Sequence, residues 1–311
     1  KVLDRVGSYF GLRKIETDEK GIRFNNAQFY QKLVLAQNYW PETGLTMPDE
    51  EAGRKDILLA KQAGFNGLRI HQKIEDERFL FLCDTEGLLV WAEYPATYEF
   101  NDRAISAIAA EWLEAGRQQY NHPCVIAWVP FNESWGIPNV YTDKLQQRFT
   151  EGIYYLTKAF DAMRPVMCND GWEHTCSDIV TVHDYDGCVE RVNDRYKNDM
   201  KDILDNKIAP TNYRFVMAKG YEYQGQPIVV SEYGGFKLAG TEGWGYDGEA
   251  KDAEDLVRKY DEITSAYKKM EKVCGFCYTQ LTDVYHETNG LMSFDRTPKV
   301  PLKEIKKINE R

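Results

Sequence analysis

The amino-acid sequence predicts an α/β fold, a single (β/α)8 TIM barrel. Strand-like and helix-like segments alternate along the chain, as they do in βα units. The strand-like segments are continuous Val/Ile/aromatic runs, typical of strands buried on both faces in a parallel sheet. The length of 311 residues suits such a barrel folded as one unit. Together these observations favour a closed barrel over an open sheet.

Eight segments are predicted as strands because β-branched and aromatic residues gather in them and turn-forming residues flank them. In chain order they are residues 28–35, 65–70, 88–93, 124–131, 164–168, 178–182, 227–231 and 273–280. Most are followed by a polar or charged side chain, which in a barrel comes to the rim where ligands bind.

Helices are predicted between most of these strands, with acidic residues in the first turn of 48–63 and glycines after its end and after the end of 75–86. The predicted helices are residues 48–63, 75–86, 102–120, 140–163, 249–272 and 302–310. Residues 190–225 are polar and irregular, and the sequence assigns no element there beyond a possible substrate loop.

Residues 1–21 form a lead-in segment, with a strand-like piece at 9–15 and a charged turn at 16–21. We expect this segment to be the remnant of a preceding β-rich domain, and residues 22–311 to form the (β/α)8 barrel. No apolar stretch approaches the roughly 20 residues that span a bilayer, and the first residues lack a signal-peptide core. The chain itself therefore indicates a cytoplasmic protein, or a periplasmic or secreted one if a signal peptide has been removed.

Composition excludes some classes of partner. The net charge of −10 would repel a phosphate backbone, so we expect no nucleic-acid partner, and no membrane partner either. The seven cysteines are odd in number and scattered, which favours reduced, buried thiols over a disulfide framework.

Two glutamates at strand ends are the main candidates for catalysis. Glu133 follows the predicted strand 124–131, and Glu232 follows 227–231. Cleavage of an acetal needs one proton donor for the departing oxygen and one carboxylate facing the anomeric carbon. Two carboxylates on separate strands of one barrel could supply both, and the alternative is a pair of rim carboxylates that serve stability. The pattern therefore suggests hydrolysis of a glycosidic bond.

Other polar and aromatic side chains share the same predicted rim. Those expected to line a substrate pocket are Arg69, His71, Asn132, Trp172, His183, Tyr185, Tyr233 and Gln280, with Glu93, Asn169, Asp170 and Asp283 beside them. A metal is not expected, because the group His174, Asp178, His183 and Asp184 lacks a recognised ligand spacing. No cofactor is needed for the hydrolysis.

Four segments resemble the catalytic barrel of glycoside hydrolase family 2. They are FNESWG at 131–136, VSEYGG at 230–235, GFNGLRIH at 64–71 and GFCYTQLTD at 275–283, and the resemblance runs from about Arg23 to the end of the chain. It implies a retaining exo-β-glycosidase, in which Glu133 is the acid/base and Glu232 the nucleophile. Asn132 would bind the sugar 2-hydroxyl, while Arg69 and Tyr185 would hold the nucleophile ionised and oriented.

The resemblance also implies a carbohydrate substrate and additional N-terminal β domains in the full-length protein. β-Galactosidase-like specificity is the best single expectation, with β-mannosidase and β-glucuronidase types as alternatives. Gln280 stands where many members of the family place a tryptophan, and residues 289–291 lack the lysine of the Asn-x-Lys pair that glucuronidases use. A carbohydrate-binding barrel that is inactive without its preceding domains is a further alternative.

Overall fold

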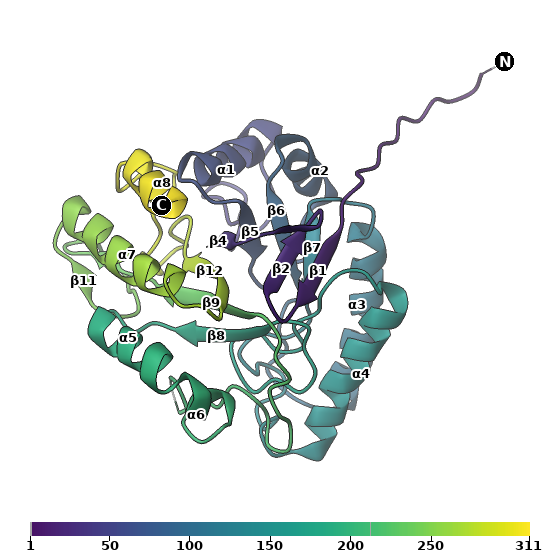
Figure 1. The fold of residues 1–311 in the computed structure, drawn as a ribbon. Helices are drawn as coiled ribbons and strands as arrows, with labels where there is room; N and C mark the ends of the chain where they lie inside the picture. The colour runs from purple at the N-terminus through teal and green to yellow at the C-terminus, as the bar shows by residue number, and fades with distance from the viewer. Residues whose placement is uncertain (1, 212) are drawn as a thin grey trace.

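The computed structural model describes residues 2–211 and 213–311, and its centre is a curved parallel sheet surrounded by helices (Figure 1). The sheet has seven strands in the order β7-β6-β5-β4-β12-β9-β8, and every pairing in it is parallel. The strands are β4 (Gln31–Ala36), β5 (Gly67–Ile70), β6 (Leu89–Glu93), β7 (Val125–Val129), β8 (Val180–Asp184), β9 (Ile228–Gly234) and β12 (Val273–Thr279).

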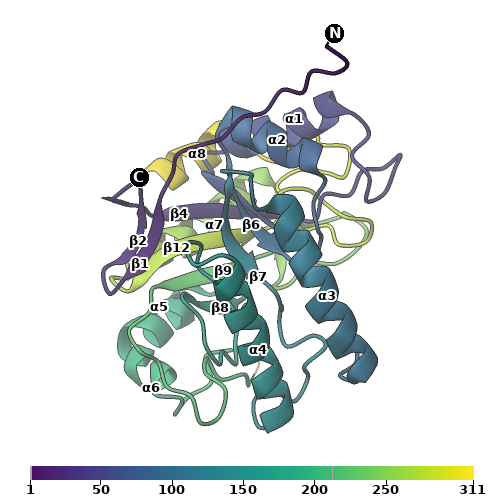
Figure 2. The same ribbon diagram turned by 90° about the vertical axis from the view of Figure 1, so that its right-hand side faces the viewer.

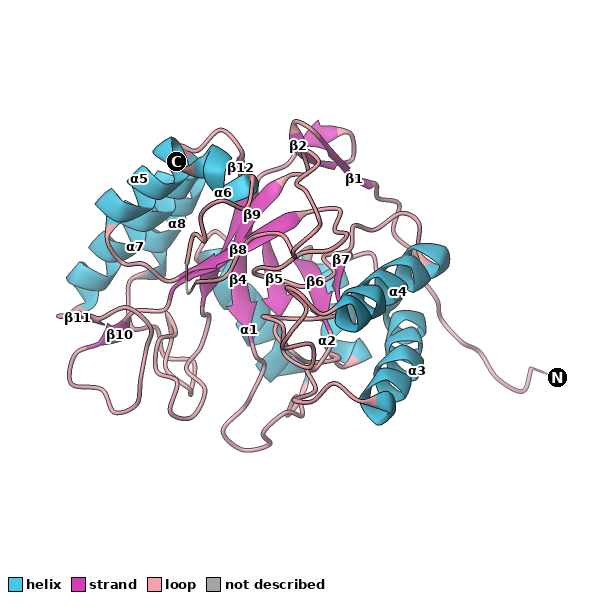
Figure 3. Ribbon diagram, turned by 90° about the horizontal axis from the view of Figure 1, so that it is seen from below, coloured by secondary structure: helices cyan, strands magenta, loops and turns pink. Residues whose placement is uncertain are grey.

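The pairing of β4 with β12 joins the first strand of the sheet to the last one in the chain, with Gly275 opposite Gln31. Because all seven strands run in the same direction, their carboxyl ends meet at one edge of the sheet. Long loops gather along that edge (Figure 3). The polar residues that follow the strands are thereby brought to a common surface.

The predicted strand at 164–168 is not a strand of the sheet. Only Val166 forms a bridge, with Trp128 of β7. Pro165 has no N–H to donate, and the N–H of Cys168 donates to the side chain of Ser177 instead of to a neighbouring strand. The segment still lies between β7 and β8. The N–H of Trp128, in β7, donates to the carbonyl of Pro165, and the N–H of Asp178, just ahead of β8, donates to the carbonyl of Val166.

The helices cover the outside of the sheet (Figures 1 and 2). They are α1 (Glu50–Gln62), α2 (Glu77–Glu86), α3 (Asp102–Gln119), α4 (Lys144–Phe160), α5 (Val189–Asn198), α6 (Met200–Leu204), α7 (Ala253–Lys268) and α8 (Leu302–Glu310). Several begin later than the sequence predicts, because an aspartate cap fixes the first turn. Asp143 accepts from the N–H of Leu145, and Asp252 accepts from that of Asp255.

Helices α5 and α6 lie in the stretch that the sequence left unassigned. The predicted helix start at 249 is occupied by β11 (Glu249–Ala250), which pairs with β10 (Lys237–Leu238) in the loop after β9.

A small antiparallel sheet made of β1 (Ile15–Asp18), β2 (Gly21–Phe24) and β3 (Ala27–Gln28) precedes the barrel (Figure 2). Ile15 and Ile22 are buried against the apolar filling of the barrel, which includes Leu33 and Met167. The strand-like piece predicted at 9–15 is wrong apart from Ile15, because residues 9–14 form no regular element and Phe10 and Leu12 are exposed.

The apolar core has two parts, one inside the barrel and a larger one between the sheet and the helices. All seven cysteines are free thiols; Cys83, Cys124, Cys168 and Cys277 are buried as predicted, whereas Cys176, Cys188 and Cys274 are partly exposed. Among the helices that the structure describes, none combines the length and the apolar character needed to cross a membrane.

Candidate active site

The carboxyl ends of the strands bring most of the predicted pocket residues into one cluster. β5 supplies an arginine, β7 is followed by an Asn-Glu pair, β8 ends in a His-Asp pair followed by a tyrosine, and β9 supplies a glutamate. The residues so gathered are Arg69, His71, Asn132, Glu133, His183, Tyr185 and Glu232. The cluster is linked by hydrogen bonds rather than separated by packed apolar groups.

Arg69 is the fully buried centre of this cluster. Its guanidinium donates to Glu93 Oε2 at 2.8 Å, to Glu232 Oε1 at 2.5 Å and to Asn132 Oδ1 at 2.6 Å. It also forms an ion pair with Asp170 at 3.0 Å. One permanent cation therefore compensates three buried carboxylates and fixes the orientation of the Asn132 amide.

Glu232 is held as a carboxylate. Its Oε1 accepts from Arg69, its Oε2 accepts from the Tyr185 hydroxyl, and His183 Nδ1 lies 3.4 Å from Oε2. Burial alone would raise the pKa of Glu232, but the charges of His183 and Arg69 outweigh it and lower the pKa to about 2. An ionised, oriented carboxylate is what a nucleophile at this position needs.

His183 is a second cation, placed between carboxylates. Its Nε2 lies 2.9 Å from Asp170 Oδ2 and its Nδ1 lies 2.8 Å from Glu133 Oε1. Burial would lower the pKa of His183, but the charge of Glu232 and the hydrogen bonds to Asp170 and Glu133 raise it to about 10. Gly171, at φ +101°, lets the ring pass, since a Cβ there would lie 2.7 Å from His183 Nδ1.

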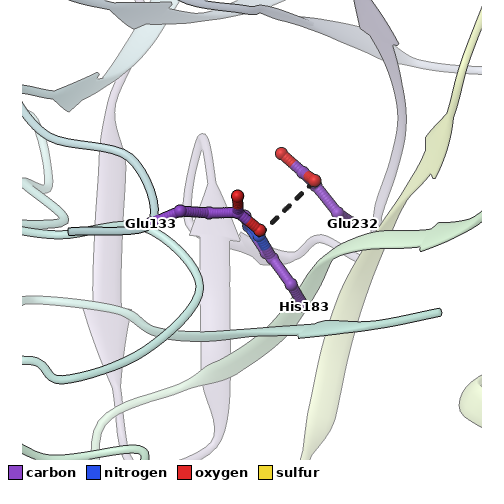
Figure 4. A group of neighbouring side chains, drawn as sticks. All are labelled: Glu133, His183 and Glu232. Atoms are coloured by element: carbon purple, nitrogen blue, oxygen red, sulfur yellow. Dashed lines mark hydrogen bonds and ion pairs between the residues drawn. The ribbon is translucent and has the colours of Figure 1, made fainter. Parts of the chain in front are cut away.

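Glu133, in the turn that follows β7, reaches the same space from the side opposite Glu232 (Figure 4). Its backbone is left-handed, with φ 51°, and so is that of Ser134, with φ 60°. The N–H of Glu133 donates to the Asp170 carbonyl, and that of Ser134 donates to the Asn169 side chain. These bonds hold a strained turn that directs the carboxylate inward.

The two glutamates differ in exposure and lie close together. The side chain of Glu133 is 24% exposed, whereas that of Glu232 is 4% exposed. One carboxylate oxygen of each residue and a nitrogen of His183 all lie within 4.8 Å of one another. Glu133 Oε1 is engaged by His183, and in the part of the chain that the structure describes no hydrogen bond involves Oε2. That oxygen is free to meet a ligand.

The remaining predicted residues lie around this centre in different ways. His71 Nδ1 lies 3.1 Å from Glu93 Oε1, and although burial would lower the pKa of His71, the charge of Glu93 raises it. Trp172 is nearly buried, packed edge-on against His183 with ring centroids 5.6 Å apart. Trp172 therefore supports His183. The sequence had suggested that its ring lines the substrate pocket, but the ring does not present an open face for stacking on a sugar.

Gln280 is fully buried at the end of β12, where it donates to Asn289 Oδ1 at 2.8 Å and accepts from Gln37 at 3.1 Å. Tyr233 lies outside the cluster, contrary to expectation. Its side chain is buried between β9 and α7, and its hydroxyl is 2.6 Å from Thr264 Oγ1. Neighbouring residues of a strand point to opposite faces, so Glu232 inside the barrel places Tyr233 outside it.

Some residues of the site were not assigned a role from the sequence. Glu93 and Asp170 were expected only near the mouth, yet both bind Arg69. Tyr246 was missed, because it lies in the loop between β10 and β11 and follows no barrel strand. Its ring stacks on Tyr185 with centroids 3.6 Å apart, and Gly235 makes room for it.

Glu133, His183 and Glu232 offer three donor atoms at a spacing that could hold a metal ion. Both nitrogens of His183 already face carboxylates, and the charges of these groups raise its pKa to about 10, which favours a ring that donates to Asp170 and Glu133. The imidazolium itself supplies the positive charge between the carboxylates.

Comparison with known proteins identifies the family of the chain. The family model described as "Glycosyl hydrolases family 2, TIM barrel domain" matches residues 15–311. A β-galactosidase of Vibrio cholerae is 32% identical over 180 residues, which are 55% of this chain and 16% of that protein. A putative β-glucuronidase of Formosa agariphila is 28% identical over 166 residues, which are 48% of this chain and 19% of that protein.

Among solved structures, a family 2 β-galacturonidase from Eisenbergiella tayi bound to galacturonate superimposes with a TM-score of 0.79 at 22% identity. The match covers 96% of this chain and 55% of that one. At this identity the likeness concerns the fold, and the chain spans about half of that structure. On the family match over residues 15–311, the chain belongs to glycosyl hydrolases family 2, of which it comprises the TIM barrel domain.

Proposed function

We propose that this chain is the catalytic barrel of a retaining exo-β-glycosidase that releases terminal β-linked sugars by double displacement. The observation that carries the proposal is the approach of Glu133 and Glu232 within 4.8 Å, oxygen to oxygen. Retaining enzymes hold their two carboxyl groups about 5 to 5.5 Å apart, whereas inverting enzymes leave room for a water at about 6.5 to 9.5 Å. The spacing found here favours direct attack by a carboxylate.

In the first step, Glu232 attacks the anomeric carbon and forms a glycosyl ester as the bond to the leaving oxygen breaks. Glu133 transfers its proton to that oxygen. Arg69 and Tyr185 keep Glu232 ionised until the attack, and its charge is consumed as the ester forms. The free Oε2 of Glu133 is the atom suited to carry the proton.

In the second step, Glu133, now a carboxylate, takes a proton from water as the water attacks the anomeric carbon. The ester bond breaks, and the electron pair returns to Glu232. His183 lies beside both glutamates and stabilises whichever carries the negative charge. Because Arg69 holds Asn132 Oδ1, the Nδ2 amide group is left to donate to the sugar 2-hydroxyl.

For the sugar, a β-galactosidase-like preference is our first proposal. The V. cholerae relative bears that name, while the Formosa and Eisenbergiella proteins leave uronic acids as an alternative. Since the chain spans only part of these relatives, we further propose that the full-length protein carries additional β domains ahead of the barrel. A barrel that binds sugar without turnover is the competing outcome if those domains complete the site.

Hydrolysis of a panel of nitrophenyl β-glycosides tests the proposal. Turnover is expected to be abolished by Glu232→Ala and partly restored by azide, which then yields the α-glycosyl azide. Glu133→Ala is expected to spare substrates with a good leaving group in the first step. A β-configured first product in the NMR spectrum supports retention, and an α-configured one contradicts it. Sugar binding without release of nitrophenol by the barrel alone, together with turnover by the full-length protein, would favour the binding alternative.

A further inference from the structure

A half-buried carboxylate, Glu287, lies at the site without a part in the two displacement steps. It belongs to the loop after β12, and its backbone pairs with Val284 and Trp244. Glu287 Oε2 accepts from Gln37 Nε2 at 2.9 Å, and Oε1 accepts from Asn289 Nδ2 at 3.2 Å. Gln280 bonds to both of these amides. We call Gln37, Gln280, Glu287 and Asn289 the Glu287 cluster.

The strands that precede the cluster place it on the same side of the sheet as the proposed nucleophile, Glu232. Gln37 follows β4 and Gln280 follows β12, and β12 pairs with β9, which carries Glu232. Strand β7, which precedes Glu133, is at the far end of the strand order. Burial raises the pKa of Glu287, and the nearby charges of His71 and Glu232 act on it in opposite directions. Contacts also link Glu287 to the nucleophile: its backbone pairs with Trp244, the Trp244 ring packs against Tyr246, and Tyr246 stacks on Tyr185, which donates to Glu232.

The direction of the reaction decides which part of the sugar meets this cluster. The leaving oxygen must lie on the side of Glu133, which protonates it. With its anomeric carbon at Glu232, the sugar ring then extends away from β7, toward β9, β12 and β4. The ring hydroxyls remote from the anomeric carbon consequently lie beside the Glu287 cluster.

In the described part of the chain, no lysine or arginine compensates the carboxylate of Glu287. Among residues 2–211 and 213–311, no ion pair involves Glu287. The neighbouring Lys299 is bound to Asp283 and to the carbonyl of Thr288. A carboxylate on the sugar would meet the Glu287 carboxylate with no lysine or arginine paired to it, which is unfavourable in a partly buried site. Sugar hydroxyls, in contrast, can donate to Glu287.

We propose that Glu287 is a specificity-determining residue that accepts hydrogen bonds from hydroxyls of a neutral terminal sugar and excludes sugars that carry a carboxylate. This inference rests on the proposed function, whose substrate class it names. Although the Eisenbergiella structure holds galacturonate, the residues of the Glu287 cluster offer amides and a carboxylate, which match a neutral pyranoside.

The test compares neutral nitrophenyl β-glycosides with the corresponding β-uronides for the wild type, Glu287→Gln and Glu287→Ala. Glu287→Gln keeps the shape and removes the charge, so the ratio of kcat/KM for uronide to kcat/KM for neutral glycoside should rise about tenfold or more. Glu287→Ala should raise KM for the neutral glycoside. Glu242→Gln, an exposed residue in the loop before β11, is the matched control and should leave the ratio unchanged.

A wild type that prefers uronides, or a ratio unchanged in Glu287→Gln, overturns the role of Glu287 while the glycosidase proposal stands. Failure to hydrolyse any member of the panel contradicts the proposed function instead. Calorimetric binding of a neutral iminosugar and of its uronic counterpart then still decides the inference without turnover. Tighter binding of the neutral compound, lost in Glu287→Gln, supports it, and tighter wild-type binding of the uronic compound refutes it.

Discussion

Replacement of Glu232 by glutamine is expected to destabilise the fold as well as to abolish activity. Glutamine keeps the shape of the side chain and removes its charge, much as protonation would. The pKa falls from an ordinary 4.5 to about 2 in the folded chain, so the folded environment favours the ionised form. At roughly 1.4 kcal/mol per pKa unit, the folded chain gains about 3 kcal/mol from ionised Glu232 at pH 7.

The sign of this effect gives it a pH dependence. Because the folded pKa is depressed, the stabilisation is present above pH 4.5 and is lost as the pH falls toward about 2. Urea denaturation of the wild type and of Glu232→Gln should show a gap of about 3 kcal/mol at pH 7 that narrows below pH 4.5.

Glu19→Gln, in the exposed turn between β1 and β2, serves as the control and should be neutral. The opposite result, a more stable variant, is common at active sites, because their residues are often selected for function at a cost in stability. If Glu232→Gln is as stable as the wild type at pH 7, or more stable, the cations do not hold this carboxylate in the way described.

Three other substitutions test separate contacts of the site. Tyr185→Phe removes a hydrogen bond from Glu232, so its pKa should rise and the acid limb of the kcat/KM profile should move up by about one pH unit; an unmoved limb would contradict this contact. Gly171→Ala should cost about 1 to 3 kcal/mol in unfolding free energy and lower kcat, because the new Cβ would collide with His183 at a positive φ; wild-type kinetics would argue against that packing. Tyr233→Phe should lower the unfolding free energy by about 1 kcal/mol and leave kcat and KM unchanged, since its hydroxyl bonds to α7. A change in the KM of Tyr233→Phe would indicate that Tyr233 lines the pocket.

Much of the barrel could be predicted from the sequence because its strands are buried on both faces. The run VIAWV of β7 and the run IVV at the start of β9 are apolar at every position, and such runs leave few alternatives to a parallel sheet. Segment 164–168 looked similar but contains Pro165, and the missing N–H reduces it to a bridge. Helix starts were placed early because an apolar pattern does not reveal which aspartate will cap.

The two glutamates proposed as the catalytic pair could be located from the sequence because each stands at the end of an apolar run that forms a buried strand. Trp172 and Tyr233 were misjudged for a different reason. A position near a strand end does not say whether a side chain points into the barrel mouth, under it or toward a helix. Tyr246 and Glu287 come from loops, and only the folded structure brings Tyr246 beside Tyr185 and Glu287 beside Gln37.

The central claim is that Glu232 forms the covalent bond to the sugar. A 2-deoxy-2-fluoro glycoside with a good leaving group slows both steps and lets the glycosyl-enzyme accumulate. Peptide mass spectrometry of the trapped protein should find the label on Glu232, and none should form in Glu232→Gln. Label on any other residue, or rapid turnover to an inverted product without label, would contradict the account.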